Sequence, residues 1–255
     1  MTIQYASDLH LEFQQNTKWL TEHPLQVAGD VLVLAGDIIL LGEEALKQHP
    51  FFDWCSSNYR LTLIVPGNHE YYKGAPALDD TLRDYDLPLR HNVHYCNNHS
   101  VTLGDTQIFL TTMWSRISPE NIDCVQAGMT DFYRIIYDGD LLLAQDCATV
   151  HRRCLRWLDA ALQASTARHK VVVTHHCPMM VEDPKYKPNG LTEAFVVDMS
   201  DFIQNHSIDH WIYGHTHYNA GDGMQLGSTT MHCNQLGYVR YGAVPGYTPA
   251  ATITV

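Results

Sequence analysis

The hydrophobic pattern of this chain consists of short apolar runs, rich in β-branched residues, that end in polar loops. Six of these runs predict strands, at residues 3–7, 31–35, 61–65, 107–111, 171–174 and 210–213. Several are apolar at every position, which is typical of strands buried on both faces of a sheet. We therefore expect a sheet core that is covered on its outer faces.

Helical periodicity separates the predicted strands. Residues 43–57, 77–84, 142–164 and 198–206 favour helices. The clearest is 142–164, where Val150, Cys154 and Leu158 fall on one face. Strands that alternate with helices indicate a layered α/β core.

The pattern changes in two parts of the chain. After Gly221, short runs at 224–226, 229–233, 238–241 and 251–255 predict antiparallel hairpins that complete a second sheet. Residues 113–140 have weak periodicity and several turn formers, which predicts an irregular lobe over the active face. We find neither a repeat nor a low-complexity linker, so we expect a single domain over residues 1–255.

Composition and charge narrow the function classes. The chain has 255 residues, of which 45% are hydrophobic and 17% charged, and its apolar runs are too short to span a bilayer. No secretory signal is evident at the N-terminus, and seven scattered cysteines without a Cys-x-x-Cys pair favour reduced thiols in a cytoplasmic protein. The net charge of −12 disfavours binding to a long nucleic acid, although it permits a phosphate substrate beside bound cations.

Potential metal ligands follow five of the predicted strands. They are Asp8, His10, Asp37, Asn68, His69, His175, His215 and His217. Because open α/β sheets bind ligands at the carboxyl ends of their strands, we expect these side chains to converge. Carboxylate, imidazole and amide donors without cysteine suit Mn, Fe, Zn, Co or Ni, and the set is large enough for two ions that share a carboxylate.

Other acidic and histidine residues cannot join this predicted metal site because of their positions in the chain. Asp30 precedes the strand that Asp37 follows, so it lies at the opposite end of that strand. His91, His94 and His99 follow no predicted strand, and we expect them in a solvated loop.

The five blocks together resemble the calcineurin-like metallophosphoesterase superfamily. They are Asp-x-His, Gly-Asp, Gly-Asn-His-Glu, His and Gly-His-x-His, in this order from residue 8 to residue 217. The resemblance implies a four-layered α/β/β/α sandwich, with two mixed sheets flanked by helices and a dinuclear site at the strand ends. It also implies that one ion is held by Asp8, His10 and His217, the other by Asn68, His175 and His215, and that Asp37 bridges them.

The resemblance also implies a reaction. Two divalent or mixed-valence ions, with Mn or Fe favoured, would hold a bridging hydroxide that attacks the phosphorus of a small phosphate mono- or diester. His69, oriented by Glu70 or another carboxylate, would protonate the leaving oxygen. Position 40 is Leu, where the purple acid phosphatase branch has Tyr, so the chain does not resemble that branch. Two alternatives remain open: a nuclease acting on short nucleic acids or nucleotides, and a metal-binding scaffold without catalysis.

Several residues outside the blocks are weaker candidates. We expect His176 to support a ligand by a hydrogen bond. Arg116 and Arg134, in the lobe, and Lys185 and Lys187, after His175, are candidates for binding a substrate phosphate. For any one of them, a solvated surface charge is the more common role. Tyr71 and Tyr72 are expected at the substrate rim or in the core. The motifs specify phosphate chemistry and leave the substrate, the native metal and the oligomeric state open.

Overall fold

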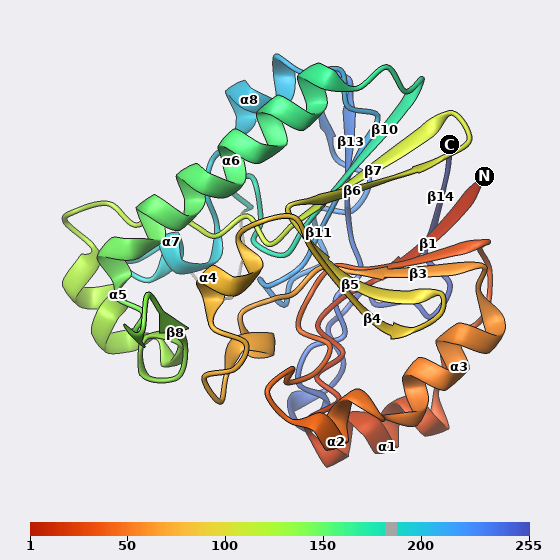
Figure 1. Ribbon diagram of the computed structural model, residues 1–255, viewed down its shortest axis with the longest axis horizontal. Coiled ribbons are helices and arrows are strands. Elements are labelled where there is room, and N and C mark those ends of the chain that lie inside the picture. Colours follow the sequence, from red (N-terminus) through yellow and green to blue (C-terminus); the bar gives the residue numbers. More distant parts are fainter. Residues whose placement is uncertain (182–187) are drawn as a thin grey trace.

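A computed structural model describes residues 1–181 and 188–255 (Figure 1). Its first sheet has six strands in the order β14-β1-β2-β3-β5-β4. The four central strands are parallel, and β14 and β4 are antiparallel edges. The strands are β1 (Thr2–Ala6), β2 (Val31–Leu34), β3 (Leu61–Ile64), β4 (Tyr85–Arg90), β5 (Val93–Asn97) and β14 (Thr252–Thr254).

The second sheet repeats this plan with the order β12-β13-β11-β10-β7-β6. Its four central strands are parallel, and both edges are antiparallel. The strands are β6 (His99–Leu103), β7 (Thr106–Thr111), β10 (His169–Thr174), β11 (His210–Tyr213), β12 (Gln225–Leu226) and β13 (Thr229–Cys233).

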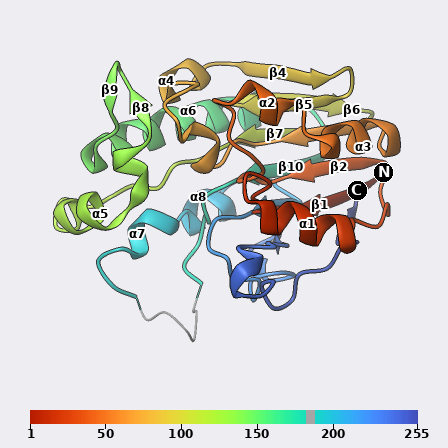
Figure 2. The same ribbon diagram turned by 90° about the horizontal axis from the view of Figure 1, so that it is seen from below.

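Each sheet is apolar on both faces, as the continuous runs predicted. In β2, Val31 and Val33 belong to the core between the two sheets, whereas Leu32 and Leu34 face the outer helices. Helices α1 (Gln14–Glu22), α2 (Glu44–Lys47) and α3 (Pro50–Asn58) cover the first sheet, and α6 (Cys147–Ala164) and α8 (Ser200–Gln204) cover the second (Figures 1 and 2). The predicted four-layered α/β/β/α sandwich is therefore confirmed.

The predicted helices are present with altered ends. The segment predicted as one helix over 43–57 forms α2 and α3, because Pro50 begins the second helix, where its missing N–H costs nothing. The segment 142–164 begins as a 3₁₀ turn, η3 (Ala144–Asp146), and continues as α6. The other two predicted helices are shorter, as α4 (Leu78–Thr81) and α8.

Some predictions were wrong. Residues predicted as a strand over 238–241 form the 3₁₀ turn η4 (Val239–Tyr241). The strands β4, β5 and β6 and helix α1 were missed. Two of them, β4 and β6, are half-exposed edge strands whose polar side chains interrupt the apolar pattern of a strand. His94 and His99 lie on β5 and β6, not in a loop, and each pairs with an aspartate.

The segment after β7, where the lobe was predicted, consists of short elements. They are α5 (Ile122–Gly128), η2 (Thr130–Tyr133), β8 (Ile136–Tyr137) and β9 (Asp140–Leu141). Two further short elements, η1 (His69–Tyr71) and α7 (Thr192–Phe195), follow β3 and β10. None of the helices in the described part of the chain combines the length and apolarity of a membrane span.

Candidate metal centre

Every predicted ligand lies in a loop directly after a parallel strand. Strands β1, β2 and β3 of the first sheet lead into the loops of Asp8 and His10, of Asp37 and of Asn68. Strands β10 and β11 of the second sheet lead into those of His175 and of His215 and His217. Two sheets packed face to face thus bring these loops to one edge of the sandwich.

The backbone at this edge adopts an uncommon conformation. Asp8, His10, Asp37, His215 and His217 have φ values of 55°, 49°, 56°, 74° and 50°. The left-handed region costs an L-residue about 1–2 kcal/mol, and such conformations cluster at functional sites. Five strained residues among the eight predicted candidates mark this edge as functional rather than as a set of ordinary turns.

Two glycines make room for the ligand side chains. A Cβ on Gly36 would collide with the His175 ring, and one on Gly67 would collide with Asp37, lying 2.6 Å from its backbone nitrogen. These glycines let three strand-end loops approach more closely than any other residue would permit.

The donor atoms form two clusters. In the first, His217 Nε2 lies 3.2 Å from Asp8 Oδ1 and 3.1 Å from His10 Nε2. In the second, His175 Nε2 lies 3.2 Å from Asn68 Oδ1 and 3.1 Å from His215 Nδ1.

Asp37 lies between these clusters. Its Oδ2 is 3.7 Å from His10 Nε2 in the first cluster, and its Oδ1 is 3.4 Å from His175 Nε2 in the second. One carboxylate therefore offers an oxygen to each cluster, which is the arrangement that two neighbouring cations need if they share a ligand.

The spacing of the donors fits metal ions. Donors that surround one ion at about 2.1 Å are about 3.0–3.4 Å from one another. In the second cluster, His175 Nδ1 and His215 Nε2 each face a backbone carbonyl oxygen, which requires a proton on that nitrogen. The neutral rings therefore direct lone pairs toward each other from His175 Nε2 and His215 Nδ1, 3.1 Å apart, which a cation would satisfy. Of the described residues, Asp8, Asp37, Glu70 and Asp131 are buried acids, and no Lys or Arg is buried to balance them. The clusters therefore suit bound cations.

The lowered pKa values of three of these histidines also favour bound cations. Burial lowers the pKa of His10 and of His175 to about 4, and lowers the pKa of His215 well below its usual value. Neutral imidazole is the form that binds a metal. Burial raises the pKa of Asp37 well above its usual value, a cost that an adjacent cation would relieve.

His69 stands beside the clusters with both ring nitrogens occupied. Its Nδ1 is 2.9 Å from Glu12 Oε1, and its Nε2 is 3.0 Å from the Tyr238 hydroxyl. Burial opposes protonation, but the carboxylates of Asp37, Glu12 and Asp131 outweigh it and raise the pKa of His69 to about 9. Sequence reasoning missed Glu12 and Tyr238. The alternation Asp8, His10, Glu12 was a signal for the first, and nothing marked the second.

Glu70 serves the ligand loops and not the His69 ring. Its carboxylate accepts hydrogen bonds from the backbone N–H groups of Asp37, Ile38 and Gly67, at 3.0, 2.7 and 2.8 Å. The Tyr95 hydroxyl donates to it as well. Glu70 thus joins the loops after β2 and β3, and the carboxylate that the structure places against His69 is Glu12.

Asp131, in the lobe, was also missed. Its Oδ1 accepts hydrogen bonds from Asn68 Nδ2, at 2.8 Å, and from the Tyr72 hydroxyl, at 2.6 Å. The first bond turns Asn68 Oδ1 toward the second cluster. The Tyr72 ring lies 4.4 Å from the His69 ring, whereas Tyr71 is fully buried in the core.

His176 lies behind the second cluster. Its ring is 4.3 Å from the ring of His215 and 5.0 Å from that of Trp114, and its Nδ1 has no hydrogen-bond partner among the described residues. It therefore packs against a predicted ligand without donating a hydrogen bond to it from Nδ1.

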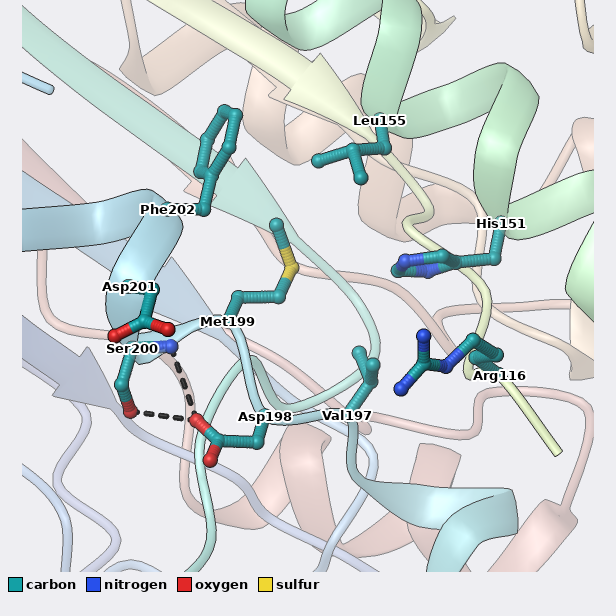
Figure 3. A pocket seen from close by; sticks show the side chains of 9 residues that line it. All are labelled: Arg116, His151, Leu155, Val197, Asp198, Met199, Ser200, Asp201 and Phe202. Carbon is teal, nitrogen blue, oxygen red and sulfur yellow. Dashed lines mark hydrogen bonds between the residues drawn. The ribbon is translucent and has the colours of Figure 1, made fainter. Parts of the chain in front are cut away.

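Arg116 and Arg134, the two basic candidates among the described residues, do not join these clusters. Arg116 lines a separate cavity of about 220 Å³ with His151, Asp198 and Met199, and none of the predicted ligands lines that cavity (Figure 3). Arg134 is exposed on the lobe. Lys185 and Lys187 lie outside the described residues.

Comparison with known proteins identifies the family. The sequence model of the calcineurin-like phosphoesterase family matches residues 1–219. The chain is 28% identical over 265 residues to "Uncharacterized protein L509" of Acanthamoeba polyphaga mimivirus, covering 92% of this chain and 91% of that protein.

Two solved structures are similar in fold. The phosphopantetheinyl hydrolase PptH of Mycobacterium tuberculosis superposes with a TM-score of 0.65 at 13% identity, over 99% of this chain and 95% of that one. TT1561 of Thermus thermophilus gives a TM-score of 0.51 at 12% identity, over 92% and 88% of the two chains. The chain belongs to the calcineurin-like phosphoesterase family and is a metal-dependent hydrolase of phosphate esters.

Proposed function

We propose that this chain hydrolyses small phosphate mono- or diesters at a two-metal centre. Asp8, His10 and His217 hold one ion, and Asn68, His175 and His215 hold the other. The observation that carries this assignment is that the two oxygens of Asp37 face separate donor clusters. Mn or Fe is the proposed metal, and the carboxylate, imidazole and amide donors are compatible with either.

The ions would supply positive charge for the phosphate oxygens and acidify a water molecule to a nucleophile. The residues of the chain do the rest. Glu12 accepts a hydrogen bond from the Nδ1–H of His69, which leaves Nε2 as the nitrogen that delivers a proton to the leaving oxygen. Asp37 also accepts a hydrogen bond from the His69 backbone N–H, at 2.9 Å, so the proton donor and the shared ligand keep a fixed separation.

The test uses purified protein loaded with Mn²⁺. We expect turnover of p-nitrophenyl phosphate, of its bis-ester, or of both, and loss of that turnover after treatment with a chelator. Because the net charge is −12, we expect no cleavage of plasmid DNA or of long single strands. If neither ester is hydrolysed with any divalent metal, the proposal fails.

Glu12→Gln should lower kcat by about 10–100-fold, a common cost of removing a group that orients an active-site side chain. The amide can still accept the Nδ1 hydrogen bond, but it lacks the charge that favours protonated His69. Steady-state kinetics at saturating Mn²⁺ measure the effect. Glu22→Gln, on exposed α1, is the matched control, and equal kcat in both variants would rule out the role of Glu12.

Asp131→Ala should weaken metal binding by about 10–100-fold, because the Asn68 amide and the Tyr72 hydroxyl lose their shared acceptor. Asn68 is then free to turn its nitrogen toward the cluster. Titration with Mn²⁺, followed by calorimetry, measures the affinity. Asp123→Ala removes an exposed carboxylate from the same lobe and should bind as the unmodified protein does. Unchanged affinity in Asp131→Ala would contradict the prediction.

A further inference from the structure

A cluster of aromatic and cationic side chains lies next to His69 and takes no part in the proposed hydrolysis of the phosphate ester. The Tyr238 hydroxyl contacts His69 Nε2, and the Phe13 ring lies 5.6 Å from the Tyr238 ring. The Arg240 guanidinium lies 5.7 Å from the centre of the Tyr238 ring and 4.6 Å from that of Tyr241. The residue whose hydroxyl touches His69 therefore also carries the ring that contacts this guanidinium.

The position of this segment is fixed by the loop after β1. The backbone N–H of Gly237 donates to Asp8 O at 3.0 Å, and buried Asn16 donates from Nδ2 to the carbonyls of Leu9 and Gly237, at 2.9 and 2.8 Å. Asn16 Oδ1 also accepts from the Val239 N–H. Tyr238 and Arg240 are thus held in register with the first donor cluster.

His69 identifies the side of the site that this segment occupies. A general acid contacts the oxygen that leaves, so the groups beyond it face the leaving group. On that side lie the rings of Phe13 and Tyr238, which suit contact with a flat, partly apolar body. Arg240, an exposed residue, adjoins the Tyr238 ring.

Arg240 is an exposed residue, so a substrate can reach its guanidinium. Two tyrosine rings flank it, which limits its motion and reduces the entropy cost of binding an anion. Arg240 makes no ion pair, and its guanidinium no hydrogen bond, with any residue that the structure describes. Its N–H donors match a carboxylate or phosphate, which they can bind through two parallel hydrogen bonds.

We propose that Arg240, held between Tyr238 and Tyr241, binds a second anionic group on the leaving group of the substrate. The preferred substrates are then phosphate esters whose leaving group is planar and carries its own carboxylate or phosphoryl group. This inference rests on the proposed function, and in particular on His69 as the general acid. It makes Arg240 a specificity-determining residue that does not participate in bond breaking.

The test compares two aryl phosphates that differ in one charge. 4-Carboxyphenyl phosphate carries the second anion, and 4-carbamoylphenyl phosphate is a neutral match of similar size. We expect Arg240→Gln to lower kcat/KM for the carboxylate substrate by about five- to tenfold and to leave kcat/KM for the amide substrate unchanged. Arg240→Lys should lower kcat/KM for the carboxylate substrate by an intermediate factor. A third substrate, 4-(phosphonomethyl)phenyl phosphate, distinguishes a phosphoryl preference from a carboxylate preference.

The control is Arg156→Gln, which removes an exposed guanidinium from α6 on the opposite helical layer (Figure 1). This variant should leave kcat/KM unchanged for both substrates. Equal effects of Arg240→Gln on both substrates, or no effect on either, would overturn the inference. Absence of turnover of the amide substrate by the unmodified protein would instead count against the proposed function.

Discussion

His69→Asn is expected to lower kcat by about 10²–10⁴-fold while two metal ions per chain remain bound. The structure separates the two roles of this residue. Its ring nitrogens face Glu12 and Tyr238, and neither is a proposed ligand. Its backbone N–H supports Asp37 and is retained in the variant. Metal analysis of the dialysed protein, together with single-turnover kinetics, measures both quantities.

His94→Asn provides the matched control for this variant. His94 lies on β5 and pairs with Asp86 at the surface, so kcat should not change. The geometry also offers an opposing interpretation, because His69 can form a donor trio with His10 and Asp37. If His69→Asn loses a metal ion, His69 is a ligand, and the general-acid assignment is wrong.

Gly67→Ala is expected to lower metal content below two ions per chain and to reduce activity by at least about 10²-fold. The added methyl group would overlap Asp37 and would lie 2.8 Å from His175 Cε1. A packed interior cannot absorb such an overlap without movement, and here the atoms that must move are the proposed shared ligand and a ligand of the second ion. A misplacement of about 1 Å is enough to cost two orders of magnitude in rate.

Gly104→Ala separates local overlap from general damage. Gly104 has a φ of +65°, but a Cβ there would meet nothing within 4 Å. This variant bears backbone strain alone, so a small loss of thermal stability with normal metal content is expected. A folded Gly67→Ala protein with two ions and normal kcat would show that the close approach of these loops is not required.

The central strands were predictable because they are buried on both faces, and the resulting apolar runs are visible in the sequence. The four-layered arrangement came from the family resemblance, whereas the order of the strands was not predicted. Edge strands such as β4 were missed because their exposed positions carry polar residues, and the pattern of residues 238–241 suits a strand although these residues form η4. The short elements of the lobe depend on tertiary contacts that no local pattern records.

The site was predictable to the extent that its residues follow strands. The blocks from Asp8 to His217 could be recognised because each combines a strand end with a donor side chain. Glu12, Asp131 and Tyr238 reach the site from loops whose course depends on packing, over separations of as many as 169 residues in the case of Tyr238 and His69. Conversely, Arg116 was a candidate for binding a substrate phosphate because of its charge, but it lines a different cavity.

The central claim is that two ions lie on either side of Asp37. Anomalous X-ray diffraction from crystals grown with Mn²⁺, recorded on both sides of the manganese edge, tests it directly. We expect two peaks about 3.5–4 Å apart, one beside Asp8, His10 and His217, and the other beside Asn68, His175 and His215. A single peak, or peaks that do not adjoin Asp37, would contradict the account.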